Sequence, residues 1–144
     1  MEKNSISLKA CPIILREKND EIEVLSFQHP LAGKQIVKGT IDPGEDYAEA
    51  ALRELHEESG IDDARVKDFI GDVLFEDEQQ SWHIYICETV NRELPESWSH
   101  TALEGDGNEY NFSFFWHKLS DGTDNDWHYT FRKVLEIVNQ HIQN

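Results

Sequence analysis

The stretch 39–61, with the sequence GTIDPGEDYAEAALRELHEESGI, constrains the fold more than any other part of the chain. It begins with two glycines and Pro43 within a few residues, a combination that favours a loop. From about Asp46 to Ser59 most residues are strong helix formers, with acidic residues suited to a helix start and Gly60 suited to the position after its end. The sequence therefore predicts a loop, a helix and a second turn in direct succession.

The predicted helix carries an unfavourable distribution of charge. At about 100° per residue, its alanines and leucines share an apolar face, while Glu54, Glu57 and Glu58 share a neighbouring arc. Like charges one turn apart repel, and negative charge in the last turn opposes the helix dipole. A hard divalent cation such as Mg²⁺ relieves this conflict, because it binds carboxylate oxygens together with water and phosphate. The arc is therefore a candidate metal site, although three glutamates alone more often mark a solvated helix face.

Arg53 lies within the same helix, one turn from both Glu49 and Glu57. It can pair with either carboxylate. A contact with Glu45, two turns towards the N-terminus, requires the loop to fold back onto the helix.

The spacing across the whole stretch is more specific than the glutamates alone. The pattern is Gly, five residues, Glu, seven residues, then Arg-Glu-apolar-any-Glu-Glu-any-Gly-apolar, and each fixed position is filled by Gly39, Glu45, Arg53, Glu54, Leu55, Glu57, Glu58, Gly60 and Ile61. This stretch resembles the Nudix box, the signature of the Nudix hydrolases. Outside the box and the general order of strands, the chain shows no further specific resemblance.

The resemblance implies both a fold and an activity. The fold is an α/β/α sandwich around a mixed sheet, in which the box forms loop, helix and loop. The activity is hydrolysis of a nucleoside diphosphate linked to another moiety, by water attack on phosphorus with Mg²⁺ or Mn²⁺. The metal ligands implied are Glu54, Glu57 and Glu58, helped by the Gly39 carbonyl, and Arg53 and Glu45 are implied to orient the box by ion pairing. The base is left open between Glu57 and a glutamate from a late loop.

Three residues outside the box are further candidates. Lys38 precedes the box glycine and either contacts a phosphate or is a plain surface lysine at the end of a strand. Glu104 and Glu109 lie in or just after a long irregular stretch, 91–107, and long loops in small proteins are often functional. Either glutamate is a candidate to contact substrate or metal or to act as the base, although a single acidic residue is more often solvated surface. The aromatic residues Trp82, Tyr85, Trp116 and Trp127 are expected in the core more than against a nucleobase.

The remaining chain predicts an α+β arrangement. Strands are expected at 5–16, with Pro12 at an edge or bulge, and at 21–27, 35–38, 66–75 with a break at Gly71, 82–87 and 110–116. The spacing of Phe131, Val134, Leu135, Val138 and Ile142 predicts an amphipathic C-terminal helix. With no repeat or linker, we expect residues 1–144 to form one domain with a helix on each side of the sheet.

Composition limits the partners. The formal net charge of −16 opposes binding to nucleic-acid polymers and anionic membranes, so a small nucleotide-type substrate is expected, held by metal ions and local cations. Cys11 and Cys87 lack zinc-ligand spacing and are expected as buried free thiols, which fits the cytoplasm. The first ten residues have no apolar segment typical of a leader. The protein is expected to be a monomer or a homodimer.

Two other functions are compatible with these features. A Nudix-like domain can bind a nucleotide as a sensor or regulatory module without hydrolysing it, although such domains usually lack some of the box carboxylates. An acidic interaction domain without any small-molecule site is the third alternative. The proline that marks many ADP-ribose hydrolases and the tyrosine that marks many dinucleoside polyphosphate hydrolases are both missing from 72–80 (DVLFEDEQQ), so the substrate is left open.

Overall fold

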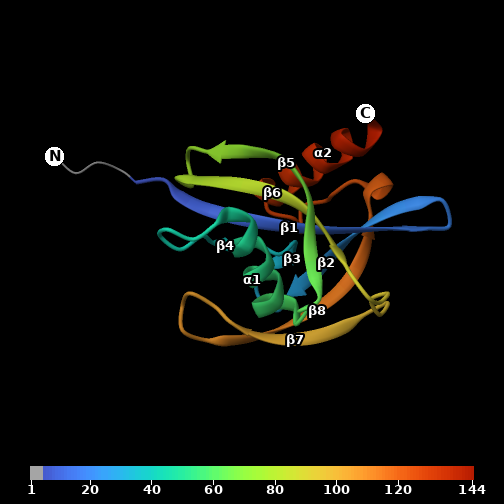
Figure 1. The fold of residues 1–144 in the computed structure, drawn as a ribbon, viewed down its shortest axis with the longest axis horizontal. Helices are drawn as coiled ribbons and strands as arrows, with labels where there is room; N and C mark the ends of the chain where they lie inside the picture. Colours follow the sequence, from blue (N-terminus) through green and yellow to red (C-terminus); the bar gives the residue numbers. More distant parts are fainter. Residues whose placement is uncertain (1–4) are drawn as a thin grey trace.

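The computed structural model describes residues 5–144, which form a mixed β-sheet with two helices (Figure 1). The first four residues, part of the stretch in which we expect no leader, lie outside the described part. In chain order the elements are β1 (Ser7–Lys18), β2 (Glu21–His29), β3 (Gly33–Gln35), β4 (Gly39–Thr40), α1 (Tyr47–Ser59), β5 (Ala64–Phe75), β6 (Gln80–Thr89), β7 (Trp98–Leu103), β8 (Glu109–Lys118), the short 3₁₀ helix η1 (Leu119–Asp121) and α2 (Tyr129–Gln143).

The sheet is organised around β1. Its strand order is β5-β6-β1-β2-β8-β7, with β3 paired to β2 and β4 paired to β1. The β1–β6 pair is parallel and the other pairs are antiparallel, which makes the sheet mixed. Pro12 lies where β1 passes from its short ladder with β4, at Lys9 and Ala10, to its ladder with β2, which starts at Leu15. Pro12 pairs with Tyr85 of β6 but has no ladder partner on the other side of β1, so the strand is locally an edge at Pro12, as predicted.

Alternate residues of the strands face opposite layers of the molecule. On β1, Ala10 and Ile14 belong to the apolar cluster beneath α1, whereas Cys11 and Ile13 belong to the cluster beneath α2. This alternation follows from the period of two residues in a strand. The two helices accordingly cover opposite faces of the sheet, as Figure 1 allows the reader to follow, and the predicted sandwich with a helix on each side is confirmed.

Two expectations about the strands are wrong in detail. The stretch 91–107, expected to be irregular, contains β7, which pairs along its whole length with β8. The short strand expected at 35–38 is instead β3, Gly33–Gln35, and the buried residues Ile36 and Val37 follow it without a regular ladder. Both helices begin and end close to the predicted positions.

The aromatic and sulfur-containing core residues follow the predictions. Trp82 and Trp127 are almost completely buried, while Trp116 is half-buried with the Arg16 guanidinium 4.3 Å from its ring centroid. Cys11 and Cys87 are buried and free. Within residues 5–144, no helix is both long and apolar enough to cross a membrane.

Candidate active site

The box helix α1 is fixed at both ends by residues of the predicted pattern. The side chain of Asp46 caps the N-terminus by accepting a hydrogen bond from the Glu49 backbone N–H at 3.0 Å. Gly60 ends the helix with a φ of 84°, a left-handed conformation that favours glycine, and its N–H donates to the His56 carbonyl. A side chain at Gly60 would also meet His100 on β7, with the added Cβ 3.0 Å from Nδ1. The end of α1 is thus packed closely against β7.

Arg53 joins the helix to the loop before it. Its Nε and Nη2 donate to the Glu45 carboxylate at 2.7 and 2.8 Å, and Nη2 also donates to the Thr40 carbonyl at 2.9 Å. Its Nη1 donates to Glu54 at 2.8 Å and to Glu57 at 3.3 Å. The loop does fold back onto the helix, and of the two carboxylates one turn away the structure pairs Arg53 with Glu57. The hydrogen bond that Arg53 donates to Glu45, followed by the one that it donates to Glu54, raises the pKa of Arg53.

Glu54 and Glu58 form the inner part of the site. Glu54 is only 8% exposed, and its carboxyl group lies directly against Gly39, where a Cβ atom would overlap the carboxyl carbon and both oxygens. Glu58 is partly exposed as a residue, while its carboxyl group is desolvated and lies near enough to Glu54 for the two groups to shift each other's pKa. Glycine at position 39 therefore leaves the space in which the carboxylate of Glu54 sits.

The proximity of these carboxylates changes their acidity. Desolvation raises the pKa of Glu54 despite its hydrogen bond to Arg53, and the charge of Glu57 acts in the same direction. The pKa of Glu58 is raised well above 4.5, chiefly by desolvation and then by the charge of Glu54, with a smaller contribution from Glu104, while Lys38 opposes the shift. Burial and mutual repulsion therefore both make it unfavourable for this pair to carry two negative charges.

Glu57 lies on the outer side of this pair. Its side chain is 56% exposed, and the contacts found for its carboxylate within residues 5–144 are those with Nη1 of Arg53 at 3.3 and 3.4 Å. It is thus accessible from solvent and is placed beside the buried carboxylates without being locked in position.

Two lysines lie near the start of the box. The Lys38 ammonium is 5.2 Å from the centroid of the Trp82 ring, and its charge acts on both Lys9 and Glu58. The Lys9 ammonium donates to the Thr40 hydroxyl at 2.6 Å, and its pKa is lowered by burial and by Lys38. From the sequence, Lys9 is a further candidate for a phosphate contact, with plain surface the favoured alternative. Its side chain reaches the box because Lys9 pairs with Thr40 across the β1–β4 ladder.

The structure separates the two late glutamates. Glu104 follows β7 directly, and its carboxylate is 2.6 Å from Nε2 of His29. Glu109 starts β8 and is exposed, and it pairs with Leu103. The alternate residues of β8, from Tyr110 onward, face the cluster beneath α1, so Glu109 projects from the opposite face. The structure therefore brings Glu104, and not Glu109, to the side of the sheet that α1 covers.

The donor set matches a hard divalent cation. Across residues 5–144, no three acidic, histidine or cysteine side chains are already arranged around a common point. Two desolvated carboxylates that lie close together are nevertheless a costly arrangement that a divalent cation relieves, and oxygen donors are those that Mg²⁺ and Mn²⁺ prefer. The residues that fit such an ion are Glu54 and Glu58, with the Gly39 carbonyl and the exposed Glu57 beside them.

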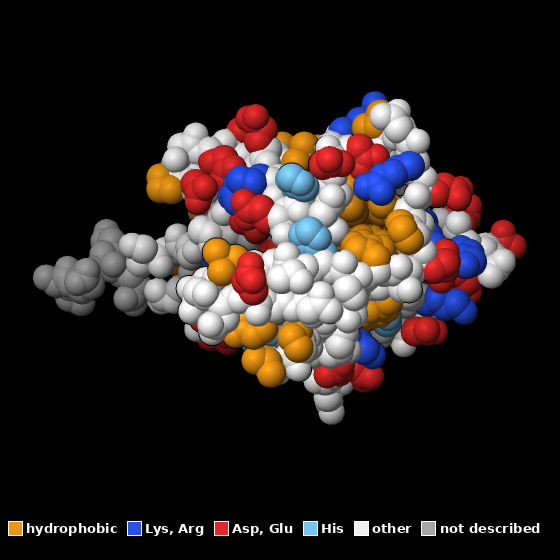
Figure 2. All heavy atoms as spheres, turned by 90° about the horizontal axis from the view of Figure 1, so that it is seen from below, with side chains coloured by type: hydrophobic (Ala, Val, Ile, Leu, Met, Phe, Trp, Pro, Cys, Tyr) orange, Lys and Arg blue, Asp and Glu red, His pale blue; other side chains and the backbone are white. Residues whose placement is uncertain are grey.

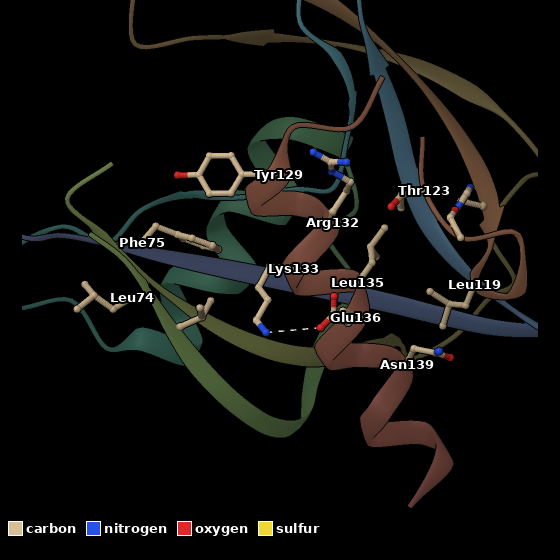
Figure 3. Close-up of a pocket in the computed structure, with 13 residues that line it drawn as sticks. Leu74, Phe75, Leu119, Thr123, Tyr129, Arg132, Lys133, Leu135, Glu136 and Asn139 are labelled. Atoms are coloured by element: carbon tan, nitrogen blue, oxygen red, sulfur yellow. Dashed lines mark hydrogen bonds and ion pairs between the residues drawn. The ribbon is translucent and has the colours of Figure 1, made fainter. Parts of the chain in front are cut away.

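A cavity elsewhere in the molecule is not part of this site. It has a volume of about 720 Å³ and lies along α2, where Phe75 from β5 and Leu119 from η1 approach Tyr129 and Leu135 (Figure 3). None of its lining residues belongs to the box.

A second hollow of about 510 Å³ borders the box loop and is lined by Thr40, Asp42 and Glu45, among others. Figure 2 shows one face of the molecule, on which acidic side chains lie among a few basic ones and histidines.

Comparison with known proteins identifies the family. A model of the NUDIX domain matches residues 8–136, which is most of the chain. The chain belongs to the Nudix family. No curated protein sequence gives a match.

Solved structures of the Nudix fold resemble this chain closely in shape. The Ap4A hydrolase of C. elegans is 21% identical to this chain and superposes on it with a TM-score of 0.66. The match covers 95% of this chain and 98% of the hydrolase chain. The MutT protein of Methanosarcina mazei Go1 has a TM-score of 0.68 and 18% identity, covering 100% of both chains. The NUDIX domain of Shewanella oneidensis NrtR, solved with ADP ribose, has a TM-score of 0.67 and 13% identity, covering 98% of this chain and 90% of its own. At these identities the likeness concerns the fold alone.

Proposed function

We propose that this Nudix pyrophosphohydrolase is metal-dependent and cleaves a nucleoside diphosphate linked to another moiety, by attack of water on phosphorus. The observation that carries the proposal is the carboxylate of Glu54, which is almost completely buried in the space left by Gly39, with Glu58 near enough that each group shifts the pKa of the other. Such a pair is unfavourable in the metal-free protein and is suited to Mg²⁺ or Mn²⁺. Ap4A and ADP ribose, named for two proteins of similar fold, both belong to the proposed substrate class.

The metal would supply a bound water of lowered pKa and would neutralise the phosphate oxygens. Glu54 and Glu58 would hold it, with the Gly39 carbonyl, and Glu57 would join them by turning away from its 3.3 Å contact with Arg53. Arg53 would keep the loop and the helix in register through Glu45.

Residues around the metal would then bind the substrate and move the proton. Lys38 and Lys9 lie near the box and offer positive charge in a protein with a net charge of −16, so we assign them to the phosphate groups. Glu57 and Glu104 are the two candidates for the base, because Glu57 is solvent-accessible and Glu104 faces the α1 side of the sheet. Glu109 is the weaker candidate because it projects from the other face.

The test is product release from a panel of substrates in Mg²⁺, in Mn²⁺ and with a chelator. The panel contains nucleoside triphosphates, ADP-ribose, diadenosine polyphosphates, nucleotide sugars and 5′-triphosphate RNA. The Glu57→Gln variant removes one charge from the proposed site without changing the size of the side chain. Glu49→Gln is the matched control, because Glu49 is an exposed glutamate of the same helix whose side chain lies outside the Arg53 network.

We expect metal-dependent turnover of one substrate class, reduced by about 10²-fold or more in Glu57→Gln and unchanged in Glu49→Gln. Nucleotide binding without turnover in the wild-type protein would instead identify a sensor. Absence of both turnover and nucleotide binding, with no thermal stabilisation by Mg²⁺ and nucleotide, would favour an interaction domain.

A further inference from the structure

His29, at the end of β2, forms a short hydrogen bond with a glutamate 75 positions further along the chain. Its Nε2 is 2.6 Å from Oε1 of Glu104. Its other ring nitrogen, Nδ1, lies 3.0 and 3.2 Å from the backbone nitrogens of Leu31 and Ala32. Since both backbone N–H groups must donate, Nδ1 is the acceptor. The proton therefore sits on Nε2, which donates to the carboxylate.

The surroundings of His29 hold the ring in place. Its side chain is 6% exposed and lies between the rings of Tyr110 and Phe112, with centroid distances of 4.9 and 5.3 Å. Both aromatic residues come from β8, the strand beside β2. Packing and two backbone hydrogen bonds thus fix the ring orientation, and Nε2 has the Glu104 carboxylate as its one polar partner in the described part of the chain.

The orientation of the Glu104 side chain depends on its hydrogen bond with His29. Its side chain is 36% exposed, and it starts the turn between β7 and β8, where its backbone N–H donates to the Asn108 carbonyl at 2.9 Å. The contact with Nε2 of His29 is the single side-chain bond found for its carboxylate within residues 5–144. A long, half-exposed glutamate with one partner takes its orientation from that partner.

The strand β7, which ends directly before Glu104, contacts the box helix α1. The Trp98 indole N–H at the start of β7 donates to the Ser59 carbonyl at 2.9 Å, and His100 packs against Gly60. His29, Tyr110 and Phe112 lie on the face of the sheet that α1 covers. In agreement with this placement, the charge of Glu104 contributes to the raised pKa of Glu58.

We propose that His29 is a positioning residue, which acts through its Nε2–H to hold the carboxylate of Glu104 towards the metal and water of the box. The proposal rests on the proposed function, in which Glu104 is one of the two candidate bases. His29 itself does not touch the metal or the substrate. It orients the carboxylate by a hydrogen bond, as neighbours of metal-site carboxylates generally do.

The experiment compares two substitutions at position 29 in two backgrounds. His29→Leu removes the hydrogen bond, whereas His29→Gln keeps an amide N–H donor on a side chain of similar reach. Each substitution is made in the wild-type chain and in the Glu104→Gln variant. We would measure kcat and KM for each protein, and the Kd for Mn²⁺ by electron paramagnetic resonance. His117→Leu is the matched control: its Nε2 is 2.7 Å from the Gly122 carbonyl and its ring packs on Trp127, on the α2 face.

We expect His29→Leu to lower kcat by about 10- to 100-fold and to weaken Mn²⁺ binding, with little change in KM. His29→Gln should recover most of the loss. In the Glu104→Gln background, His29→Leu should lower kcat by less than about threefold, because the group that it positions is already altered. His117→Leu should lower the melting temperature without lowering kcat.

Other results overturn the proposal. If His29→Leu lowers kcat by the same factor in both backgrounds, or if His117→Leu is as inactive, then His29 is only structural. If the wild-type protein binds Mn²⁺ but turns over no substrate, the proposed function fails. The role of His29 is then still tested by the Kd for Mn²⁺, and an unchanged Kd in His29→Leu refutes that role. A wild-type protein that neither binds Mn²⁺ nor turns over substrate refutes both.

Discussion

Arg53 on α1 and Glu45 in the preceding loop form a two-bond ion pair, with distances of 2.7 Å from Nε to Oε2 and 2.8 Å from Nη2 to Oε1. Glu45 is held from its other side by the Asp42 backbone N–H, 3.0 Å from Oε1. The same guanidinium donates to the Thr40 carbonyl. One arginine therefore fixes the loop against the helix, and with it the position of Gly39 against Glu54.

The Glu45–Arg53 pair predicts how stability depends on acidity. The hydrogen bond from Arg53, followed by that from Asp42, lowers the pKa of Glu45 to about 2 from its ordinary 4.5. A carboxyl group with a lowered folded-state pKa stabilises the fold fully above its unfolded pKa, and this contribution is lost as the pH falls through the folded value. The stability difference between the wild-type protein and Glu45→Gln should therefore be constant above about pH 5 and shrink between 4.5 and 2.

Urea unfolding at a series of pH values measures this difference. Glu49→Gln, on the exposed side of the same helix, should change the unfolding free energy by less than about 0.5 kcal/mol throughout. A difference for Glu45→Gln that stays undiminished at about pH 3 would contradict the pairing.

Gly39→Ala should separate binding from folding. The added Cβ would overlap the Glu54 carboxyl group, which is the far end of a flexible side chain and is able to swing away. We expect the unfolding free energy to change by less than about 1 kcal/mol while the affinity for Mn²⁺ falls by about 10- to 100-fold.

Calorimetric titration with Mn²⁺ and thermal unfolding measure the two effects of Gly39→Ala. Gly105→Ala is the control, since a Cβ at Gly105 meets no atom within 4 Å. Wild-type Mn²⁺ affinity in Gly39→Ala would mean that Glu54 is not a ligand.

The box was predictable because its determinants are local. The helix formers from Asp46 onward, the cap at Asp46 and the glycine at position 60 act within a few residues of each other, and the structure has the helix where they indicate. The choice of Glu57 over Glu49 as the partner of Arg53 was not predictable, because helical spacing is compatible with both. That choice depends on the loop, which draws the guanidinium towards Glu45 and Glu54.

The missed features depend on contacts between distant segments. The sequence of β7, WSHTAL, has little of the apolar alternation that marks a strand, and it forms one because it pairs with β8 and packs on α1. His29 and Glu104 meet only through the pairing of β2 with β8 and of β8 with β7. No local signal distinguishes His29 from the other histidines of the chain.

The two thiols should be inert in the folded protein. Burial raises the pKa of the Cys87 thiol to about 12 and raises that of Cys11 further. Because only the thiolate is nucleophilic, an aromatic disulfide reagent at about pH 8 should label both residues only as fast as the protein opens. Labelling followed by mass spectrometry, with and without urea, measures this rate. Rapid modification of either cysteine without denaturant would show that its strand is accessible in the native state.

Metal binding should be linked to proton release. The pKa of Glu58 is raised by desolvation and by the neighbouring charge of Glu54, whereas a metal ion binds the charged carboxylates, so metal binding competes with protonation of this pair. The affinity for Mn²⁺ should therefore rise with pH, by up to about tenfold per unit while the pair is protonated. Raising the salt concentration should affect this linkage little, because the two carboxylates are shielded from solvent.

Titration calorimetry in buffers of different ionisation enthalpy counts the protons released on metal binding. We expect the wild-type protein to release protons when Mn²⁺ binds, and the number released to fall as the pH rises. Glu58→Gln should remove both the proton release and most of the affinity, whereas Glu49→Gln should leave both unchanged. A Kd independent of pH, with no proton released, would mean that the metal does not enter between Glu54 and Glu58.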